Sequence, residues 1–167
     1  MSGIVVLSGD PRPDSRTARL ATGVGTSTAQ LLGARPPEVI DLAEYGHRLL
    51  VPDAAEVIGA VATVRDADLL VISTPAYNGT FTGVLKVFLD RFPAEGLAGR
   101  PALSVVVSAT PGRAEVAEGY LHALLAEMGA TTPGPGLAVA EDQLAQPDVL
   151  ISAYLDRVRG ALGVPSR

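Results

Sequence analysis

The 167-residue chain contains no cysteine and no tryptophan, and it has only two histidines. Without cysteine, the chain can form no disulfide, no Cys-ligated zinc site, no iron–sulfur cluster and no thiol nucleophile. His47 and His122 alone offer little for a metal site, and we expect none. We also expect neither histidine to act as a proton donor.

Positive charge is scarce, with 13 lysines and arginines against 18 aspartates and glutamates and a net charge of −5. This balance argues against a nucleic-acid partner bound through a broad cationic face. Long apolar runs are also missing. No run approaches the roughly 18 residues that a membrane span needs, and the N-terminal segment resembles no signal peptide, so we expect no membrane partner and a cytoplasmic protein.

The length and the 47% hydrophobic content fit one domain over residues 1–167. Short apolar runs alternate with segments of helical period, which is typical of a parallel sheet covered on both faces. The expected strands are residues 4–7, 39–42, 69–73, 103–107 and 137–140. The expected helices cover about 16–32, 54–64, 83–92 and 113–128, and a fifth contains Ile151, Tyr154, Leu155, Val158 and Leu162.

Two doubly wound α/β architectures suit such a chain, a nucleotide-binding Rossmann half and a flavodoxin-like sheet of order 2-1-3-4-5. Both place ligands at the carboxyl ends of the strands, near the point where the strand order reverses. The loops after the first, third and fourth strands are therefore where we expect the chemistry.

The loop after the first strand offers anion-binding groups. Ser15 and Thr17 carry hydroxyls, Arg12 and Arg16 carry guanidinium groups, and a helix N-terminus supplies free amides. The alternative is that Ser15 only caps the helix while both arginines are solvated.

Better-known phosphate motifs are excluded by what the chain contains. The only lysine, Lys86, lies in the third expected helix, so there is no Walker A loop. The dinucleotide fingerprint is absent, and a Cys-x5-Arg phosphatase lacks its cysteine. A receiver domain needs an aspartate where the third strand ends in Ser73-Thr74-Pro75.

Two segments, taken in order, resemble the NADPH-dependent FMN reductase family, whose members have the flavodoxin-like fold. They are Ser8-Gly9-x-Pro11-Arg12-x-x-Ser15-Arg16-Thr17 and Thr74-Pro75-x-Tyr77-Asn78-Gly79-x-x-x-Gly83-x-Leu85-Lys86-x-x-x-Asp90. A third segment, Thr110-Pro111-Gly112-Arg113, falls where the family has a glycine-containing flavin loop. Taken without the first motif, Tyr77 and Phe81 could be packed turn residues only.

The resemblance implies an α/β flavodoxin-like sheet and an enzyme that transfers a hydride from NADPH to FMN. The residues implied to hold the FMN phosphate are Arg12, Ser15, Arg16 and Thr17. Those implied to line the isoalloxazine are Pro75, Ala76, Tyr77, Asn78 and Gly79. Those implied to approach its pyrimidine side are Thr110, Pro111 and Gly112, and the charge of Arg113 suits the NADPH phosphates. No catalytic side chain is expected, because hydride transfer needs stacked rings and excluded water.

Position 10 departs from the family, which usually has a serine there. A carboxylate beside a phosphate dianion is repulsive unless Arg12 or Arg16 screens it. This repulsion between Asp10 and the phosphate would weaken flavin affinity, which suits an enzyme that releases FMN. The alternative is that Asp10 points away.

Residues 105–128 resemble the reductases that supply reduced flavin to two-component monooxygenases, which implies such a monooxygenase as partner and a homodimer or homotetramer. In that subgroup a tyrosine near the position of Tyr120 lies at the tetramer interface, although Tyr120 could also belong to an amphipathic stripe. Lys86 and Asp90 form either an exposed pair within one helix or a pair across a dimer interface.

Three rival functions remain open from the sequence. One is a quinone, azo-dye or metal-oxyanion reductase with tightly held FMN. Another is a flavodoxin-type electron carrier that does not use NADPH, although the two loop arginines and the missing tryptophan argue against it. The third is a flavin-free or regulatory member of the fold.

Overall fold

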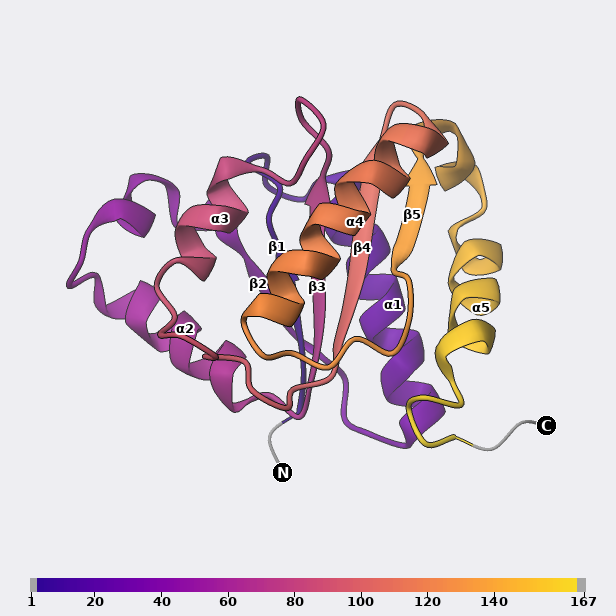
Figure 1. Cartoon of the computed structure of the whole chain (residues 1–167), viewed down its shortest axis with the longest axis horizontal. Helices are drawn as coiled ribbons and strands as arrows, with labels where there is room; N and C mark the ends of the chain where they lie inside the picture. The colour runs from indigo at the N-terminus through magenta and orange to yellow at the C-terminus, as the bar shows by residue number, and fades with distance from the viewer. Residues whose placement is uncertain (1–2, 165–167) are drawn as a thin grey trace.

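A computed structural model describes residues 3–164 as a five-stranded parallel sheet flanked by helices (Figure 1). The strand order is β2-β1-β3-β4-β5, so the predicted flavodoxin-like order 2-1-3-4-5 is confirmed. The strands are β1 (Ile4–Ser8), β2 (Glu38–Asp41), β3 (Leu69–Pro75), β4 (Ala102–Ser108) and β5 (Leu137–Ala140).

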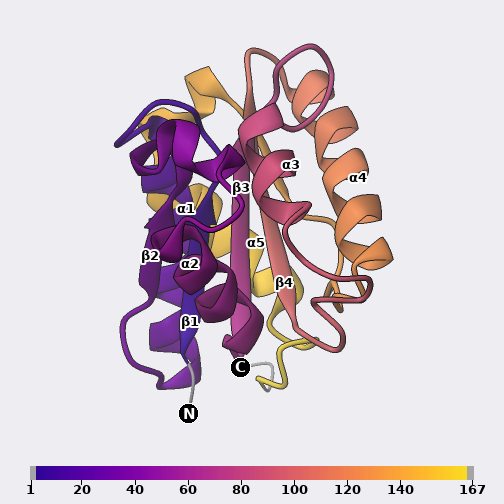
Figure 2. The ribbon, with the colours of Figure 1, turned by 90° about the vertical axis from the view of Figure 1, so that its left-hand side faces the viewer.

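The helices cover both faces of the sheet (Figure 2). They are α1 (Arg16–Leu32), α2 (Ala55–Asp66), α3 (Gly83–Leu89), α4 (Pro111–Glu127) and α5 (Pro147–Val158). One hydrophobic cluster joins α2, α3 and α4 to one face, and a second joins α1 and α5 to the other. Because both faces are covered, the central strands are apolar without alternation.

Helix α1 packs unusually close to the sheet. A Cβ at Gly25 would lie 2.5 Å from Val6 Cγ2, and one at Gly23 would lie 2.8 Å from Ile151 Cδ1. Glycine costs helix stability, as the sequence indicates, but here it allows β1 and α5 to approach the helix axis.

Most element boundaries differ from the predicted ones by one to three residues. Strand β2 ends at Asp41, because its carboxylate accepts a hydrogen bond from the Ala43 amide and begins a 3-10 turn, Leu42–Glu44. Helix α3 ends at Leu89, although Phe92 still packs edge-on against Phe88 with ring centroids 5.8 Å apart. Helix α4 begins two residues early at Pro111, whose fixed φ suits the first helical position.

The carboxyl ends of the strands lie along the upper edge of the sheet in Figure 1, where the β1–α1, β3–α3 and β4–α4 connections gather. The 3-10 turn Glu141–Ala145 leaves β5 at the same edge. Within residues 3–164, no helix is both long and apolar enough to cross a membrane.

Candidate functional site

The β1–α1 loop presents the N-terminus of α1 at this edge. Ser15 is the N-cap, and its Oγ accepts a hydrogen bond from the Ala18 amide at 3.0 Å. The amides of Arg16 and Thr17 occupy the first two helical positions, which have no intrahelical acceptor. The expected capping by Ser15 is therefore real, and it leaves two amides directed at a ligand position.

Asp10 occupies the centre of this loop and is fully buried. Its carboxylate accepts hydrogen bonds from the Arg12 amide at 2.9 Å, from Arg12 Nε at 3.1 Å and from Arg12 Nη2 at 3.2 Å. The Ser15 side chain also lowers the pKa of this carboxyl. The Asp10 carboxylate therefore faces Arg12, which screens its charge.

The protonation of Asp10 follows from these contacts. Burial by itself raises the pKa of the carboxyl, but the hydrogen bonds from Arg12 and Ser15 outweigh it and hold the pKa below its ordinary value. The same pair raises the pKa of the Arg12 guanidinium. At neutral pH the loop therefore holds a carboxylate and a guanidinium.

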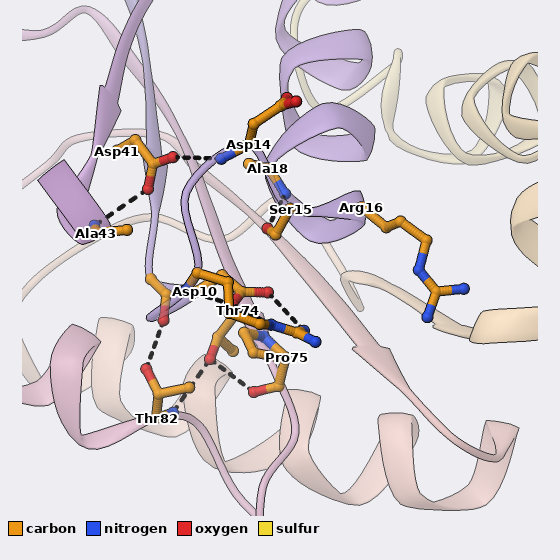
Figure 3. A network of polar contacts seen from close by, with 12 residues as sticks. Asp10, Asp14, Ser15, Arg16, Ala18, Asp41, Ala43, Thr74, Pro75 and Thr82 are labelled. Carbon is orange, nitrogen blue, oxygen red and sulfur yellow. Dashed lines mark hydrogen bonds and ion pairs between the residues drawn. The ribbon is translucent and has the colours of Figure 1, made fainter.

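Arg16 has a different acidic partner. Its Nη2 lies 2.7 Å from Glu141 Oε2, and both side chains are about half exposed. Figure 3 shows the Arg16 side chain directed away from Asp10. Both predicted phosphate-binding arginines are thus exposed but ion-paired, which differs from the solvated arginines of the alternative interpretation.

The β3–α3 loop is tied to the first loop by a threonine. Thr82 caps α3 by accepting from the Leu85 amide, and its hydroxyl donates to the Gly9 carbonyl at 2.6 Å. The Thr82 amide in turn donates to Thr74 Oγ1 at 3.1 Å (Figure 3). Sequence reasoning missed this role of Thr82, although a threonine three residues before a buried helical leucine is a capping signal.

Gly9 allows the two loops to touch. A Cβ at position 9 would lie 2.7 Å from Leu85 Cβ and 3.0 Å from the Ser73 carbonyl oxygen. The Gly9 amide donates to that carbonyl at 2.8 Å. The first two loops are therefore one connected structure.

The tip of the second loop is a tight two-residue turn. Tyr77 and Thr80 exchange backbone hydrogen bonds, and the central residues Asn78 and Gly79 have φ values of 51° and 88°. Asparagine and glycine tolerate this left-handed backbone best. The neighbouring Ala76 amide donates to the Val107 carbonyl at 2.8 Å, which anchors the turn to β4.

The third predicted loop is shorter than expected. Pro111 and Gly112 lie in the first turn of α4, not in a loop before it, and Arg113 follows them in that turn. Thr110 is the N-cap residue but makes no side-chain capping bond. The α4 N-terminus therefore faces the same edge as the α1 N-terminus.

A cavity of about 210 Å³ lies between the three loops. Seven of the predicted flavin or nucleotide residues line it: Arg12, Arg16, Thr17, Pro75, Ala76, Tyr77 and Arg113. Among residues 3–164, Arg113 is the one arginine of the cavity without a carboxylate partner. Ser15, Asn78, Gly79, Thr110, Pro111 and Gly112 belong to the surrounding loops and helix starts without lining the cavity.

Four lining residues were missed: Val107, Ser108, Ala109 and Glu141. Val107, Ser108 and Ala109 are at or just after the end of β4, and Glu141 directly follows β5, whereas site residues were expected only after the first, third and fourth strands. Since all parallel strands end at one edge, the residue after β5 was a detectable candidate.

The chemistry of the cavity suits the phosphate end of FMN. Two helix amides, the Thr17 hydroxyl and guanidinium groups supply hydrogen-bond donors. The volume is below the ~300–1,000 Å³ of usual small-molecule sites, so the rest of a flavin would extend over the Tyr77 turn.

Larger hollows lie elsewhere among residues 3–164. One of about 800 Å³ runs between α1 and α5, one of about 700 Å³ lies at the amino edge of the sheet, one of about 540 Å³ lies between the segment after α3 and the end of α4, and one of about 480 Å³ lies between α4 and the segment before β5. None of the four is near the carboxyl ends of the strands, where ligands of this architecture bind. We therefore take the smaller cavity as the candidate site.

The sequence pattern of the NADPH-dependent FMN reductase family matches residues 3–144. The chain is 29% identical over 163 residues to the NADH-dependent FMN reductase SfnE of Pseudomonas putida, covering 93% of this chain and 86% of that one. It is 35% identical over 132 residues to an FMN-dependent NADH:quinone oxidoreductase of Methylorubrum extorquens, covering 64% of this chain and 60% of that one.

Solved structures show the same fold. An apo NADH:FMN oxidoreductase, EMOB, superposes with a TM-score of 0.75 at 27% identity, covering 100% of this chain and 92% of that one. An oxidoreductase from Corynebacterium diphtheriae gives 0.80 at 19% identity, covering 99% of each chain.

These similarities confirm the predicted family, the predicted oxidoreductase class and the predicted use of FMN and a reduced nicotinamide nucleotide. The match extends over most of the chain and includes all three loops of the candidate site. The chain therefore belongs to the NADPH-dependent FMN reductase family.

Proposed function

We propose that the chain acts as an FMN reductase. FMN binds in the cavity between the three loops, and NADH or NADPH binds there after it. The observation that carries this proposal is the convergence of residues from three separate segments on one cavity beside the α1 N-terminus. FMN supplies the ring that accepts a hydride, and the reduced nicotinamide supplies the hydride.

The residues of the chain have binding roles in this proposal. Arg12, Ser15, Arg16, Thr17 and the first amides of α1 hold the phosphate. The turn Pro75, Ala76, Tyr77, Asn78 and Gly79 holds the isoalloxazine through its backbone and the Tyr77 ring. Thr110, Pro111 and Gly112 approach the pyrimidine edge. Arg113, which has no carboxylate partner among residues 3–164, suits the phosphates of the nicotinamide nucleotide.

The chain needs no side chain that takes or gives a proton to start the reaction. Its task is to fix the two rings in contact and to exclude water. The Asn78–Gly79 turn, fixed by two backbone hydrogen bonds and tied to β4, offers a rigid backbone for that purpose.

FMN in this proposal is a substrate that leaves after reduction, and the reduced flavin goes to a flavin-dependent monooxygenase in the cytoplasm. The ion-paired arginines support the release of flavin, because they leave little net charge to hold a phosphate. The whole chain, residues 1–167, acts as one domain.

The enzyme works as a homodimer or homotetramer in this proposal. Val116 and Tyr120 lie one helical turn apart on α4, with 56% and 57% of their surfaces exposed. Exposed apolar side chains on one helix face favour contact with a second copy. Lys86 and Asp90 pair within α3 at 2.6 Å, the first of the two arrangements considered for them.

A second candidate is a quinone reductase with resident FMN. The 35% identity to an FMN-dependent NADH:quinone oxidoreductase favours it. In that case FMN copurifies with the protein and the final acceptor is a quinone.

The test is NADH and NADPH oxidation by the purified chain, followed by near-ultraviolet absorbance with and without added FMN. Oxidation that depends on added FMN, by a colourless preparation, supports the FMN reductase. A yellow preparation that needs a quinone and no added FMN supports the second candidate. A protein that oxidises neither nucleotide with either acceptor contradicts both.

A further inference from the structure

We propose that Asp10 is a built-in counter-ion that competes with the flavin phosphate for Arg12, and so keeps the affinity for FMN low and its advantage over riboflavin small. The inference rests on the proposed function, because it concerns the phosphate part of the same site.

The first step is that Asp10 occupies donors that an anion would use. Its carboxylate takes the Arg12 amide and two N–H groups of the Arg12 guanidinium, at 2.9, 3.1 and 3.2 Å. A bound phosphate oxygen would make the same kind of contacts.

The second step is that the Asp10 carboxylate is buried and needs its cation. Asp10 has no exposed surface, whereas 63% of the Arg12 side chain is exposed and Arg12 lines the cavity. A phosphate that pulls Arg12 away would leave a buried carboxylate without its cation, which is strongly unfavourable. A phosphate that leaves the pair intact meets a guanidinium whose charge is already neutralised.

The third step is the charge count at the mouth of the cavity. Arg16 is paired with Glu141, so both arginines of the phosphate loop have a carboxylate within 3.1 Å. The remaining attraction for a phosphate comes from the α1 amides, the Thr17 hydroxyl and the N–H groups of the Arg12 guanidinium that Asp10 does not accept. Riboflavin lacks the phosphate and cannot use this attraction, so we expect its affinity to be only slightly lower than that of FMN.

The test measures the dissociation constants of FMN and riboflavin by fluorescence titration at one fixed ionic strength. Asp10→Asn keeps the shape and an acceptor for the Arg12 amide but removes the charge. We expect FMN to bind about tenfold more tightly to Asp10→Asn than to the wild type, the size of one charge-assisted hydrogen bond. Riboflavin affinity should stay within about twofold.

Asp14→Asn is the matched control. It removes the same charge from the same loop, but the Asp14 side chain is 81% exposed and pairs with Arg19 instead of Arg12. Its φ of 48° suits asparagine. We expect FMN affinity to change by less than about twofold in this variant.

Weaker FMN binding to Asp10→Asn would overturn the proposal, because Asp10 would then position Arg12 for the phosphate. Equal changes for FMN and riboflavin, or equal tightening in Asp14→Asn, would also overturn it. If circular dichroism shows that Asp10→Asn does not fold, Asp10→Ser takes its place with the same expected selectivity. A wild type that binds FMN but oxidises neither NADH nor NADPH would contradict the proposed function. The role of Asp10 would still be tested by the ratio of FMN to riboflavin affinity in the wild type and in Asp10→Asn.

Discussion

The guanidinium of Arg12 lies between the buried carboxylate of Asp10 and the candidate cavity, so its loss has two effects. Arg12→Ala removes a donor to the phosphate and leaves the Asp10 charge uncompensated beside it. We expect FMN binding to weaken by about 1.5–3 kcal/mol, with riboflavin binding much less affected. Calorimetric titration with both flavins measures this, and an FMN affinity unchanged within about twofold would contradict the assigned role of Arg12.

Asp10 also makes stability depend on pH. Its pKa is lower in the folded chain than the ordinary value, so its ionised form stabilises the fold above the unfolded-state pKa of about 3.9. That contribution is lost as the pH falls through the lower folded-state pKa.

We therefore expect Asp10→Asn to be about 1 kcal/mol less stable than the wild type at neutral pH, since Arg12 is largely in water, and the gap to close below about pH 4. Urea unfolding at a series of pH values measures the gap. A gap that stays constant down to strongly acidic pH would show that the Asp10 charge does not stabilise the fold.

At the scale of elements, the start of β5 is held by a buried polar contact. Glu118 on α4 is largely buried and accepts hydrogen bonds from Ser104 Oγ at 2.7 Å and from the Gly136 amide at 2.9 Å. A Cβ at Gly136 would clash with Ser104 Oγ and would lie 2.7 Å from Glu118 Oε1. The three elements α4, β4 and β5 meet here with no room for a methyl group.

Gly136→Ala should therefore destabilise the chain by about 1–3 kcal/mol through overpacking. Gly59→Ala in α2 is the control, because nothing lies within 4 Å of its added Cβ and alanine is the better helix former. Denaturant unfolding of both variants should give opposite signs, and a Gly136→Ala variant as stable as the wild type would show that this junction is loose.

The sequence predicts the order of elements well and their ends less well. The apolar runs identify all five strands, and the motif after β1 identifies the α1 N-terminus, because both patterns are local. The end of β2 depends on the hydrogen bond that the Asp41 carboxylate accepts from the Ala43 amide, and the start of α4 depends on Pro111. The hydrophobic period alone therefore misplaces both boundaries.

The site likewise contains residues that a local motif identifies and contacts that no local motif indicates. Motifs identify Arg12 and Tyr77, which share a cavity. The pairing of Arg16 with Glu141 joins residues 125 positions apart, so no local pattern indicates it. Whether Asp10 faces Arg12 also depends on loop geometry, and the sequence left both orientations open.

At the scale of the whole molecule, the exposed face of α4 bears on assembly. Val116 and Tyr120 present apolar surface one turn apart, whereas their neighbours Ala117 and Leu121 are buried in the chain's own core. We expect Tyr120→Asp to shift the protein from dimer or tetramer toward monomer, because a charge in an apolar contact is costly.

Sedimentation velocity measures this shift, and Ile58→Asp on α2, which alters another exposed apolar side chain, is the control. A wild type that sediments as a monomer would contradict the proposed assembly. A Tyr120→Asp variant that sediments like the wild-type oligomer would place the contact on another face.

A crystal structure of the chain with FMN would show directly where the flavin binds. We expect the phosphate at the amides of Arg16 and Thr17, and the ring between the Tyr77 turn and the α4 N-terminus. Flavin bound in the groove between α1 and α5, or at the amino edge of the sheet, would contradict the assignment of the site.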